Sequence, residues 1–162
     1  MKVYDRPAVL QQREELFAIT CAGTVRPTHT ASSKQVRTMA QKATDLAVTL
    51  PEDRPGMLAR AVHAVGEAGI NLEGHAEMEG VVHVLTSDPA ATRAALEVAG
   101  FRVLKEQQVV LVEVEDRPGS AAGVFRRVAD AKVNIRFSYL ATRNRLVIAA
   151  DDLQDLLTAL AV

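Results

Sequence analysis

The five residues Glu52-Asp53-Arg54-Pro55-Gly56 recur as Glu115-Asp116-Arg117-Pro118-Gly119, at an offset of 63 positions. Further identities fall at the same offset without a gap, so the pentapeptide belongs to an internal repeat. These identities are Ala59 with Ala122, Val65 with Val128, Ala68 with Ala131, Asn71 with Asn134, Val84 with Val147 and Asp88 with Asp151. The chain therefore contains two copies of one unit, which start near Leu46 and Val109.

Each copy is predicted to open with a strand and a helix. Residues 46–50 and 109–114 are short apolar runs rich in β-branched side chains, which is typical of strands. The Asp-Arg-Pro-Gly after each run favours a helix start, because Asp53 can cap the first amides and Pro55 lacks only an N–H that would be unpaired there. Apolar residues then recur at helical spacing, and the first such helix ends at Gly69.

A hairpin and a second helix follow in each copy. Residues 71–78 and 81–86 flank a Glu79-Gly80 turn of the two-residue kind. Asp88 is predicted to cap the next helix, and its counterpart Asp151 to cap the last helix of the chain. Residues 101–106 supply a fourth strand to the first copy, whereas the second copy ends two residues after Leu160 and lacks that strand.

The element order predicts an α+β fold made of two ferredoxin-like βαββαβ units, the second without its last strand. We expect the two units to pair into one continuous antiparallel sheet with the helices on one face, because each unit alone is close to the lower limit for a stable core. The first strand of the second copy would then be a bare sheet edge. We expect a partner copy, a second chain or residues 16–21 to cover it.

Composition and charge separate an N-terminal segment from the repeats. The 162 residues are 48% hydrophobic and carry a net charge of −1, which predicts a globular protein. Residues 1–45 carry a net charge of +3 and residues 46–162 a net charge of −4. We expect residues 1–45 to be an extension that is largely disordered, or in part an artefact of a start codon assigned upstream of Met39. The domain boundaries predicted for the repeats are 46–107 and 108–162.

The sequence carries no signal for a membrane, a disulfide or a metal. No apolar run reaches the roughly 18 residues that cross a bilayer, and no apolar segment follows the first charges as in a secretory signal. Cys21 is the single cysteine, and no Cys/His spacing of the zinc type occurs. We therefore expect a cytoplasmic protein without a metal or cofactor.

Each copy consists of a strand, then Asp-Arg-Pro-Gly, then an apolar helix, and then Gly69-Ile70-Asn71-Leu72 in the first copy or Val133-Asn134-Ile135 in the second. This doubled pattern resembles the ACT domain, a regulatory module of amino-acid metabolism. The resemblance covers residues 46–162 and implies a free-standing tandem ACT protein that binds an amino acid between paired domains. It further implies allosteric regulation through pairing, a homodimer and an effector enzyme as partner. The ligand-binding residues carried over are Asp53, Gly56, Met57, Leu58, Asn71, Asp116, Gly119, Ser120, Ala121 and Asn134.

These residue types suit an amino acid, which presents a carboxylate and an ammonium on one carbon. The unpaired amides at a helix N-terminus bind an anion, and an Asn side chain offers both a donor and an acceptor. The same residues also have a structural interpretation, because Asp-x-Pro-Gly is a common helix start and Gly-x-Asn a common helix end. The second copy departs from the pattern at Lys132, which replaces Gly69. It therefore stays open whether one of the two sites is degenerate.

Other functions fit less well. No nucleophile with a base and no converging carboxylate pair is evident, so we do not expect an enzyme. His75 and His83 are predicted to be off register, which disfavours a metal site. An acylphosphatase-like use of Arg54 or Arg117 stays open. RNA binding would need aromatic residues on the first and third strands, which have none. The main alternative is a ligand-free module for protein interaction or dimerisation.

Overall fold

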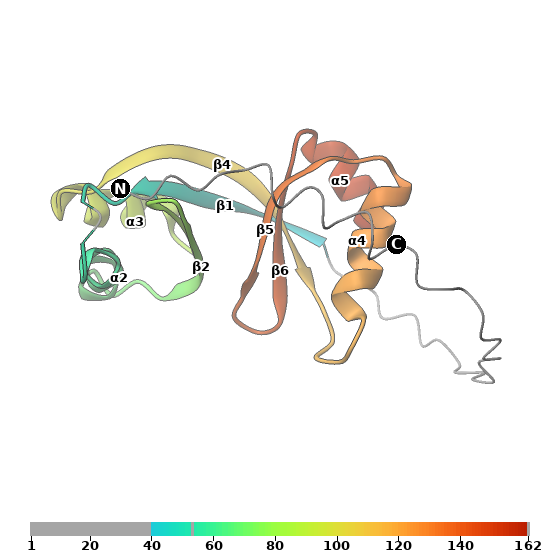
Figure 1. The fold of residues 1–162 in the computed structure, drawn as a ribbon, viewed down its shortest axis with the longest axis horizontal. Coiled ribbons are helices and arrows are strands. Elements are labelled where there is room, and N and C mark those ends of the chain that lie inside the picture. The colour runs from blue at the N-terminus through green and yellow to red at the C-terminus, as the bar shows by residue number, and fades with distance from the viewer. Residues whose placement is uncertain (1–39, 53, 162) are drawn as a thin grey trace, which may run out of the picture. The chain divides into compact units, whose positions relative to one another are not determined.

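The computed structural model describes residues 40–52 and 54–161, and its elements follow the order that the repeat predicts (Figure 1). The strands are β1 (Ala40–Thr49), β2 (Leu72–Met78), β3 (Val81–Thr86), β4 (Arg102–Glu113), β5 (Ile135–Ala141) and β6 (Arg145–Ala150). The helices are α2 (Met57–Glu67), α3 (Pro89–Val98), α4 (Ser120–Asp130) and α5 (Leu153–Leu160). We call the part with α2 and α3 the first half and the part with α4 and α5 the second half. The expectations for residues 1–39, including the start at Met39 and a strand at 16–21, lie outside the described residues.

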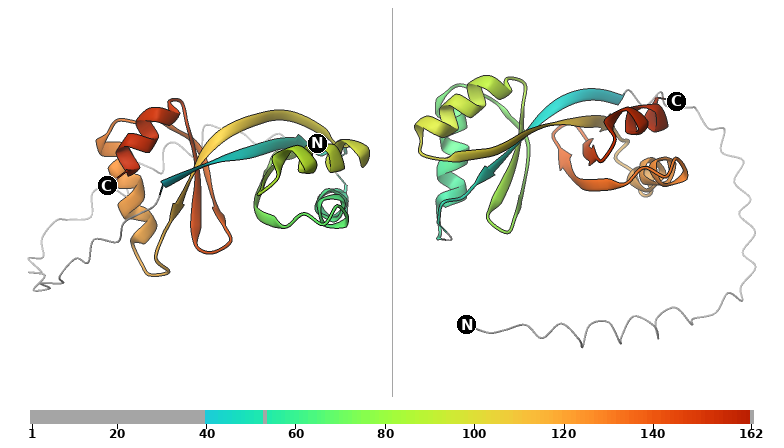
Figure 2. Two further views of the ribbon diagram at one scale, coloured as in Figure 1. Left: turned by 180° about the vertical axis from the view of Figure 1, so that it is seen from behind. Right: turned by 90° about the horizontal axis from the view of Figure 1, so that it is seen from above.

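Two long strands are shared by both halves. The segments predicted as separate strands at 101–106 and 109–114 form one continuous strand, β4, of 12 residues, which spans the predicted domain boundary. The strand β1 has 10 residues and starts at Ala40, upstream of the expected start at Leu46. The two strands pair with each other from Ala40 opposite Val112 to Thr49 opposite Arg102. In both views of Figure 2 they run side by side from one half to the other.

The expected bare edge of the second copy is covered from within the chain. The N-terminal residues of β1 lie along the C-terminal end of β4, with Ala40 opposite Val112 and Ala43 opposite Val109. The strand β6 pairs with the other side of β4. The segment that covers this edge belongs to the range that we had assigned to the extension. A second copy, another chain or residues 16–21 are not needed at this place.

The predicted open sheet with its helices on one face is wrong, because the strands close into an antiparallel barrel in the order β1-β3-β2-β5-β6-β4. The two βαββαβ units do not pair as separate ferredoxin-like sheets, since β1 and β4 join them into one sheet whose twist brings its ends together. The closing contact between β2 and β5 is a single pair, Gly74 opposite Ala141. A Cβ on Gly74 would lie 2.8 Å from the Cβ of Ala141, so only glycine allows this approach.

Three apolar clusters fill the two faces of the barrel wall. The alternation of strand side chains sends Val82 and Val84 outward beneath α2 and α3, and sends Leu85 into the barrel. In the second half Leu146 and Ile148 pack beneath α4 and α5. The interior cluster consists of Leu85, Val109, Leu111, Val147 and Ala149. The helices therefore cover the outside of the barrel, and the interior belongs to both halves.

The two copies differ by one residue in the hairpin turn. Two residues separate Met78 from Val81, whereas three separate Ala141 from Arg145. The gapless alignment of Val84 with Val147 is therefore wrong, because the extra residue shifts β6 by one position and a shift of one reverses the faces. The same shift moves the helix cap, since Asp152 rather than Asp151 accepts from the amide of Asp155, at 2.9 Å, at the start of α5.

Candidate functional sites

Two glycine loops open the first helix of each half in the same conformation. Gly56 and Gly119 stand at the N-terminal ends of α2 and α4 with φ of 92° and 89°, in the left-handed region that favours glycine. Within the described residues no side chain caps either helix, whereas Asp88 and Asp152 cap α3 and α5. Among the described residues the first amides of α2 and α4 have no side-chain acceptor, and helix geometry gives them no intrahelical one. The amides of Met57 and Ser120 donate to the backbone carbonyls of Arg54 and Arg117, at 3.4 and 3.3 Å.

The predicted side chains around these loops have different environments. Met57 is 2% exposed and belongs to the core beneath α2, so only its backbone can meet a ligand. Leu58 is half-buried against the same core, and Ala121 packs against the core beneath α4. The hydroxyl of Ser120 is buried and has no hydrogen-bond partner among the described residues. Ser120 is thus a buried polar group at the start of a helix that no described side chain caps.

The aspartates and asparagines of the predicted sites are not gathered at the loops. Asp53 lies outside the described residues. Asp116 is exposed and does not cap α4, although its place before Arg-Pro-Gly favours a cap. Asn71 and Asn134 are exposed beyond the far ends of α2 and α4. Since α2 has 11 residues, its two ends lie about 16 Å apart. One unit therefore cannot place its loop and its Asn on the same amino acid.

A pocket of about 440 Å³ adjoins the first glycine loop in sequence. Its lining holds three glutamates, Glu52, Glu77 and Glu79, and one arginine, Arg54, together with Leu50 and Gly80. Arg54 pairs with Glu52 at 2.6 Å, and the carboxylate of Glu77 accepts from the amide of Gly80 at 3.0 Å. None of the residues carried over from the family resemblance lines this pocket, but its excess of carboxylates suits an ammonium group.

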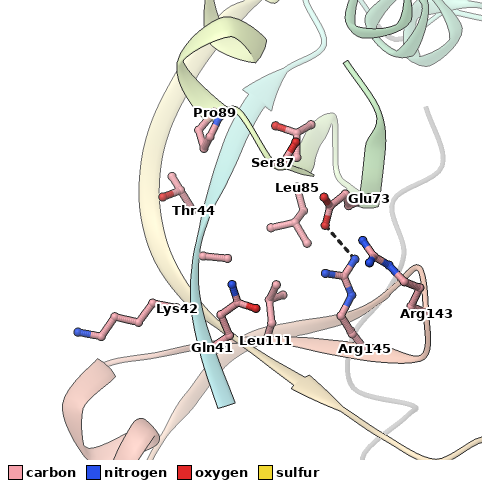
Figure 3. Close-up of a pocket in the computed structure, with 12 residues that line it drawn as sticks. Gln41, Lys42, Thr44, Glu73, Leu85, Ser87, Pro89, Leu111, Arg143 and Arg145 are labelled. Atoms are coloured by element: carbon pink, nitrogen blue, oxygen red, sulfur yellow. Dashed lines mark hydrogen bonds and ion pairs between the residues drawn. The ribbon is translucent and has the colours of Figure 1, made fainter. Parts of the chain in front are cut away.

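A second pocket, of about 480 Å³, lies where the two halves meet (Figure 3). Glu73 from β2 and Arg145 from β6 form an ion pair of 2.9 Å across the closing seam of the barrel, and both side chains are largely buried. Arg145 also donates to the carbonyl and the hydroxyl oxygen of Thr142, at 2.9 and 3.1 Å. Arg143 lines the same pocket beside this pair. Sequence reasoning missed these residues, because only closure of the barrel brings them together.

A buried carboxylate joins strands of both halves inside the barrel. Asp45 of β1 is 0% exposed and accepts three hydrogen bonds. The donors are Nδ1 of His83 at 2.8 Å, Nε2 of Gln107 at 3.0 Å and the hydroxyl of Tyr139 at 2.7 Å. The rings of His83 and Phe137 lie 4.3 Å apart between centroids. This network connects β1 to three other strands, β3, β4 and β5.

The network explains the protonation of Tyr139. Burial raises the pKa of the Tyr139 phenol far above its ordinary value, and the charge of Asp45 and the hydrogen bond to it act in the same direction. Tyr139 is therefore a neutral donor to Asp45 in the interior. The signal that could have located this network is a polar or aromatic residue at an inward strand position, at Asp45, His83 and Tyr139.

Two kinds of site are not found in the described part of the chain. The predicted mismatch of His75 and His83 is confirmed, since His83 faces Ala76 and His75 faces Val84. No group of three or more His, Cys, Asp or Glu side chains in residues 40–52 and 54–161 could hold a metal ion. Over the same residues, no helix is long and apolar enough to cross a bilayer.

Solved structures with this fold include three that bear on its class. Protein BT0572 from Bacteroides thetaiotaomicron matches with a TM-score of 0.58 and 24% identity, over 76% of this chain and 88% of that one. The regulatory subunit of aspartate kinase from Thermus flavus matches with a TM-score of 0.54 and 17% identity, over 76% and 94%. E. coli aspartokinase III in complex with lysine and aspartate matches with a TM-score of 0.52 and 14% identity, over 76% of this chain and 31% of that one.

No protein-family model and no curated protein matches the chain. At these identities the structural likeness establishes the fold, which supports the ACT-like fold that the repeated motifs resemble. The Thermus flavus structure is that of a regulatory subunit. The comparisons therefore establish the fold alone, and that fold is shared with a regulatory subunit of an aspartate kinase.

Proposed function

We propose that this protein is a non-enzymatic regulatory protein that binds an amino acid between paired ACT domains, which correspond to residues 46–107 and 108–162 of each chain, and that the ligand shifts how the domains of two chains associate. The observation that carries the proposal is the pair of helix N-termini behind Gly56 and Gly119, which no described side chain caps, in a fold shared with an aspartate kinase regulatory subunit. The E. coli enzyme in complex with lysine and aspartate supports an amino acid as the ligand class.

The amides at the start of α2 and α4 would hold the carboxylate of the amino acid. These groups point out of the helix end and carry the positive end of its dipole, which favours an anion by about 0.3–1 kcal/mol where exposed and up to about 2 kcal/mol where partly buried. The buried hydroxyl of Ser120 supplies a further donor at the second loop. The three glutamates of the pocket near the first loop would attract the ammonium.

The distance between loop and asparagine supports a pairing of domains. Because Gly56 and Asn71 lie at opposite ends of α2, contact with both types of residue requires a loop from one domain and an Asn from another. A ligand that touches both stabilises the paired arrangement by its differential affinity. We therefore propose a homodimer whose association depends on the amino acid and which passes this signal to an effector enzyme.

A ligand-free interaction module is the second candidate, because one helix surface is apolar. A groove of about 550 Å³ between α2 and α3 is lined by seven apolar residues and Glu67. Val98 in this groove is 91% exposed. An apolar surface of this kind marks a protein contact in many soluble proteins.

A thermal-shift panel of the twenty amino acids with the full chain tests the proposal. A ligand that binds only the folded state at 100 times its Kd adds about 2.7 kcal/mol of stability, which is a rise of several degrees in Tm for a domain of this size. Ala59→Asp with Ala122→Asp places a carboxylate in the exposed first turn of α2 and α4, so it should compete with the ligand carboxylate while stabilising the helices.

Gln154→Asp is the control, because it adds one carboxylate to the exposed first turn of α5, which has no glycine loop. The proposal expects a shift for one or a few amino acids, its loss in the double variant and its retention in the control. Sedimentation velocity with the same amino acid should then show a change in association. A flat panel at millimolar concentration would favour the interaction module.

A further inference from the structure

The pocket at the junction of the two halves has an excess of positive charge. Its lining includes Lys42, Arg143 and Arg145 against one carboxylate, Glu73, although residues 46–162 as a whole are net acidic. Figure 3 shows the Arg143 and Arg145 guanidinium groups next to Glu73, whereas the Lys42 side chain points away from them. The local excess near Glu73 is therefore one arginine.

That arginine is Arg143. The guanidinium of Arg145 is engaged by Glu73 and by two oxygens of Thr142. Arg143 makes no hydrogen bond and no ion pair with any described residue, and yet it stands beside a largely buried ion pair. A guanidinium cannot lose its proton, so an anion is the chemical partner that fits it.

The turn that carries Arg143 is the place where the second copy has an extra residue. Arg143 and Asn144 both have positive φ, of 60° and 52°, which is rare for a long side chain. The turn is held on both sides, because Thr142 donates to the carbonyl of Glu73 at 2.7 Å and Val114 donates to the carbonyl of Asn144 at 2.8 Å. The insertion therefore presents Arg143 to the pocket from a fixed backbone.

The rest of the lining defines what the anion is attached to. Leu85 and Leu111 form apolar wall, and Gln41 and Ser87 offer an amide and a hydroxyl that bond to no other described side chain. The N-terminus of α3 is close in sequence, but Asp88 already caps it by accepting from Ala91. A volume of about 480 Å³ is within the range of small-molecule sites. The ligand is then a small molecule with one acidic group and a short apolar part.

We propose that this pocket is a second ligand site, which binds the carboxylate of a small organic acid on Arg143, with its carbon chain against Leu85 and Leu111. The inference does not depend on the glycine loops, because it rests on other residues in another part of the barrel. A ligand here contacts β1 and β3 together with the turn between β5 and β6, so it bridges the seam that one residue pair closes.

The test is a titration of the ¹⁵N-labelled full chain with butyrate, succinate and inorganic phosphate, followed by amide NMR shifts. We expect butyrate or succinate to shift the amides of Ser87, Arg143 and Asn144 with one saturating curve. Arg143→Gln should weaken this binding about tenfold or more, because it removes a hydrogen-bonded charge pair from the complex. The control Arg126→Gln removes an exposed arginine of α4 and should leave the affinity unchanged.

The proposal would be overturned by the absence of a saturable shift at these amides, by equal affinity in Arg143→Gln, or by binding of phosphate in preference to both carboxylates. Shifts confined to the amides following Gly56 and Gly119 would also overturn it, while supporting the loop sites. Conversely, shifts at Arg143 with none at the loops for any amino acid would support the pocket and count against the proposed function.

Discussion

Removing the carboxylate of Asp45 tests whether the buried network holds the two halves together. In Asp45→Ala the donors on His83, Gln107 and Tyr139 lose their common acceptor in a fully buried position. Each buried donor left unpaired costs about 1–3 kcal/mol, and removing one member of a buried charged network costs about 3–5 kcal/mol in total. We therefore expect the free energy of unfolding to fall by about 3–5 kcal/mol.

Three further variants isolate the cause. Tyr139→Phe removes one donor and should cost about 1.5–3 kcal/mol, because its acceptor is charged. In the Asp45→Ala background the same change should cost almost nothing, since it then removes a hydroxyl that has no acceptor. Asp130→Ala is the control, because this carboxylate is exposed at the end of α4 and should change stability by less than about 0.5 kcal/mol.

Urea unfolding followed by circular dichroism measures all four free energies. The reasoning would be refuted if Asp45→Ala cost less than about 1 kcal/mol, which is below the cost of even one unpaired buried donor. Strict additivity of Asp45→Ala and Tyr139→Phe would refute it equally, since residues in one hydrogen-bond network are expected to be coupled.

Further predictions concern the seam, the phenol and the second loop. Gly74→Ala should lower the free energy of unfolding by about 1–3 kcal/mol, because the added Cβ would lie 2.8 Å from that of Ala141. In the same urea assay, Gly66→Ala in α2 and Gly123→Ala in α4 should raise it by about 0.5–1 kcal/mol, because a Cβ at either position meets no atom within 4 Å. Because the pKa of Tyr139 is raised, the native state keeps the phenol proton above about pH 10, where the unfolded chain loses it. The free energy of unfolding should therefore fall with rising pH, by up to about 1.4 kcal/mol per pH unit more steeply than in Tyr139→Phe. Equal slopes in the two proteins would contradict this. Ser120→Ala should leave the protein as stable or more so, because the hydroxyl has no partner among the described residues and alanine favours helix. Calorimetry should show weaker amino-acid binding by this variant.

The local structure could be predicted from the sequence because local rules determine it. The repeated pentapeptide and the hydrophobic periodicity locate the helices and strands, and the positive φ of Gly56 and Gly119 agrees with the repeated glycine. Helix caps were harder to predict: Asp116 does not cap α4, and Asp152 caps α5 in place of Asp151. The second error has one cause, the extra residue between Ala141 and Arg145, which gapless matching could not detect.

The barrel and its polar sites could not be predicted, because they depend on contacts between residues far apart in the chain. Nothing near Ala40 indicates that β1 continues beyond the first copy to pair with Val112. Gly74 lies within the strand β2, and its neighbours in the sequence do not identify it as the point where the barrel closes. Glu73 and Arg145 become partners only after that closure, so the pocket at the junction has no local signal in the sequence.

The most direct test of amino-acid binding at the glycine loops is a calorimetric titration of the full chain with the amino acid that gives the largest thermal shift. The account predicts saturable binding to the wild type and to Gln154→Asp, and loss of binding in the Ala59→Asp, Ala122→Asp double variant. Equal binding by all three proteins would contradict the placement at the helix N-termini, and the absence of binding heat in the wild type, at several temperatures, would contradict the proposed function.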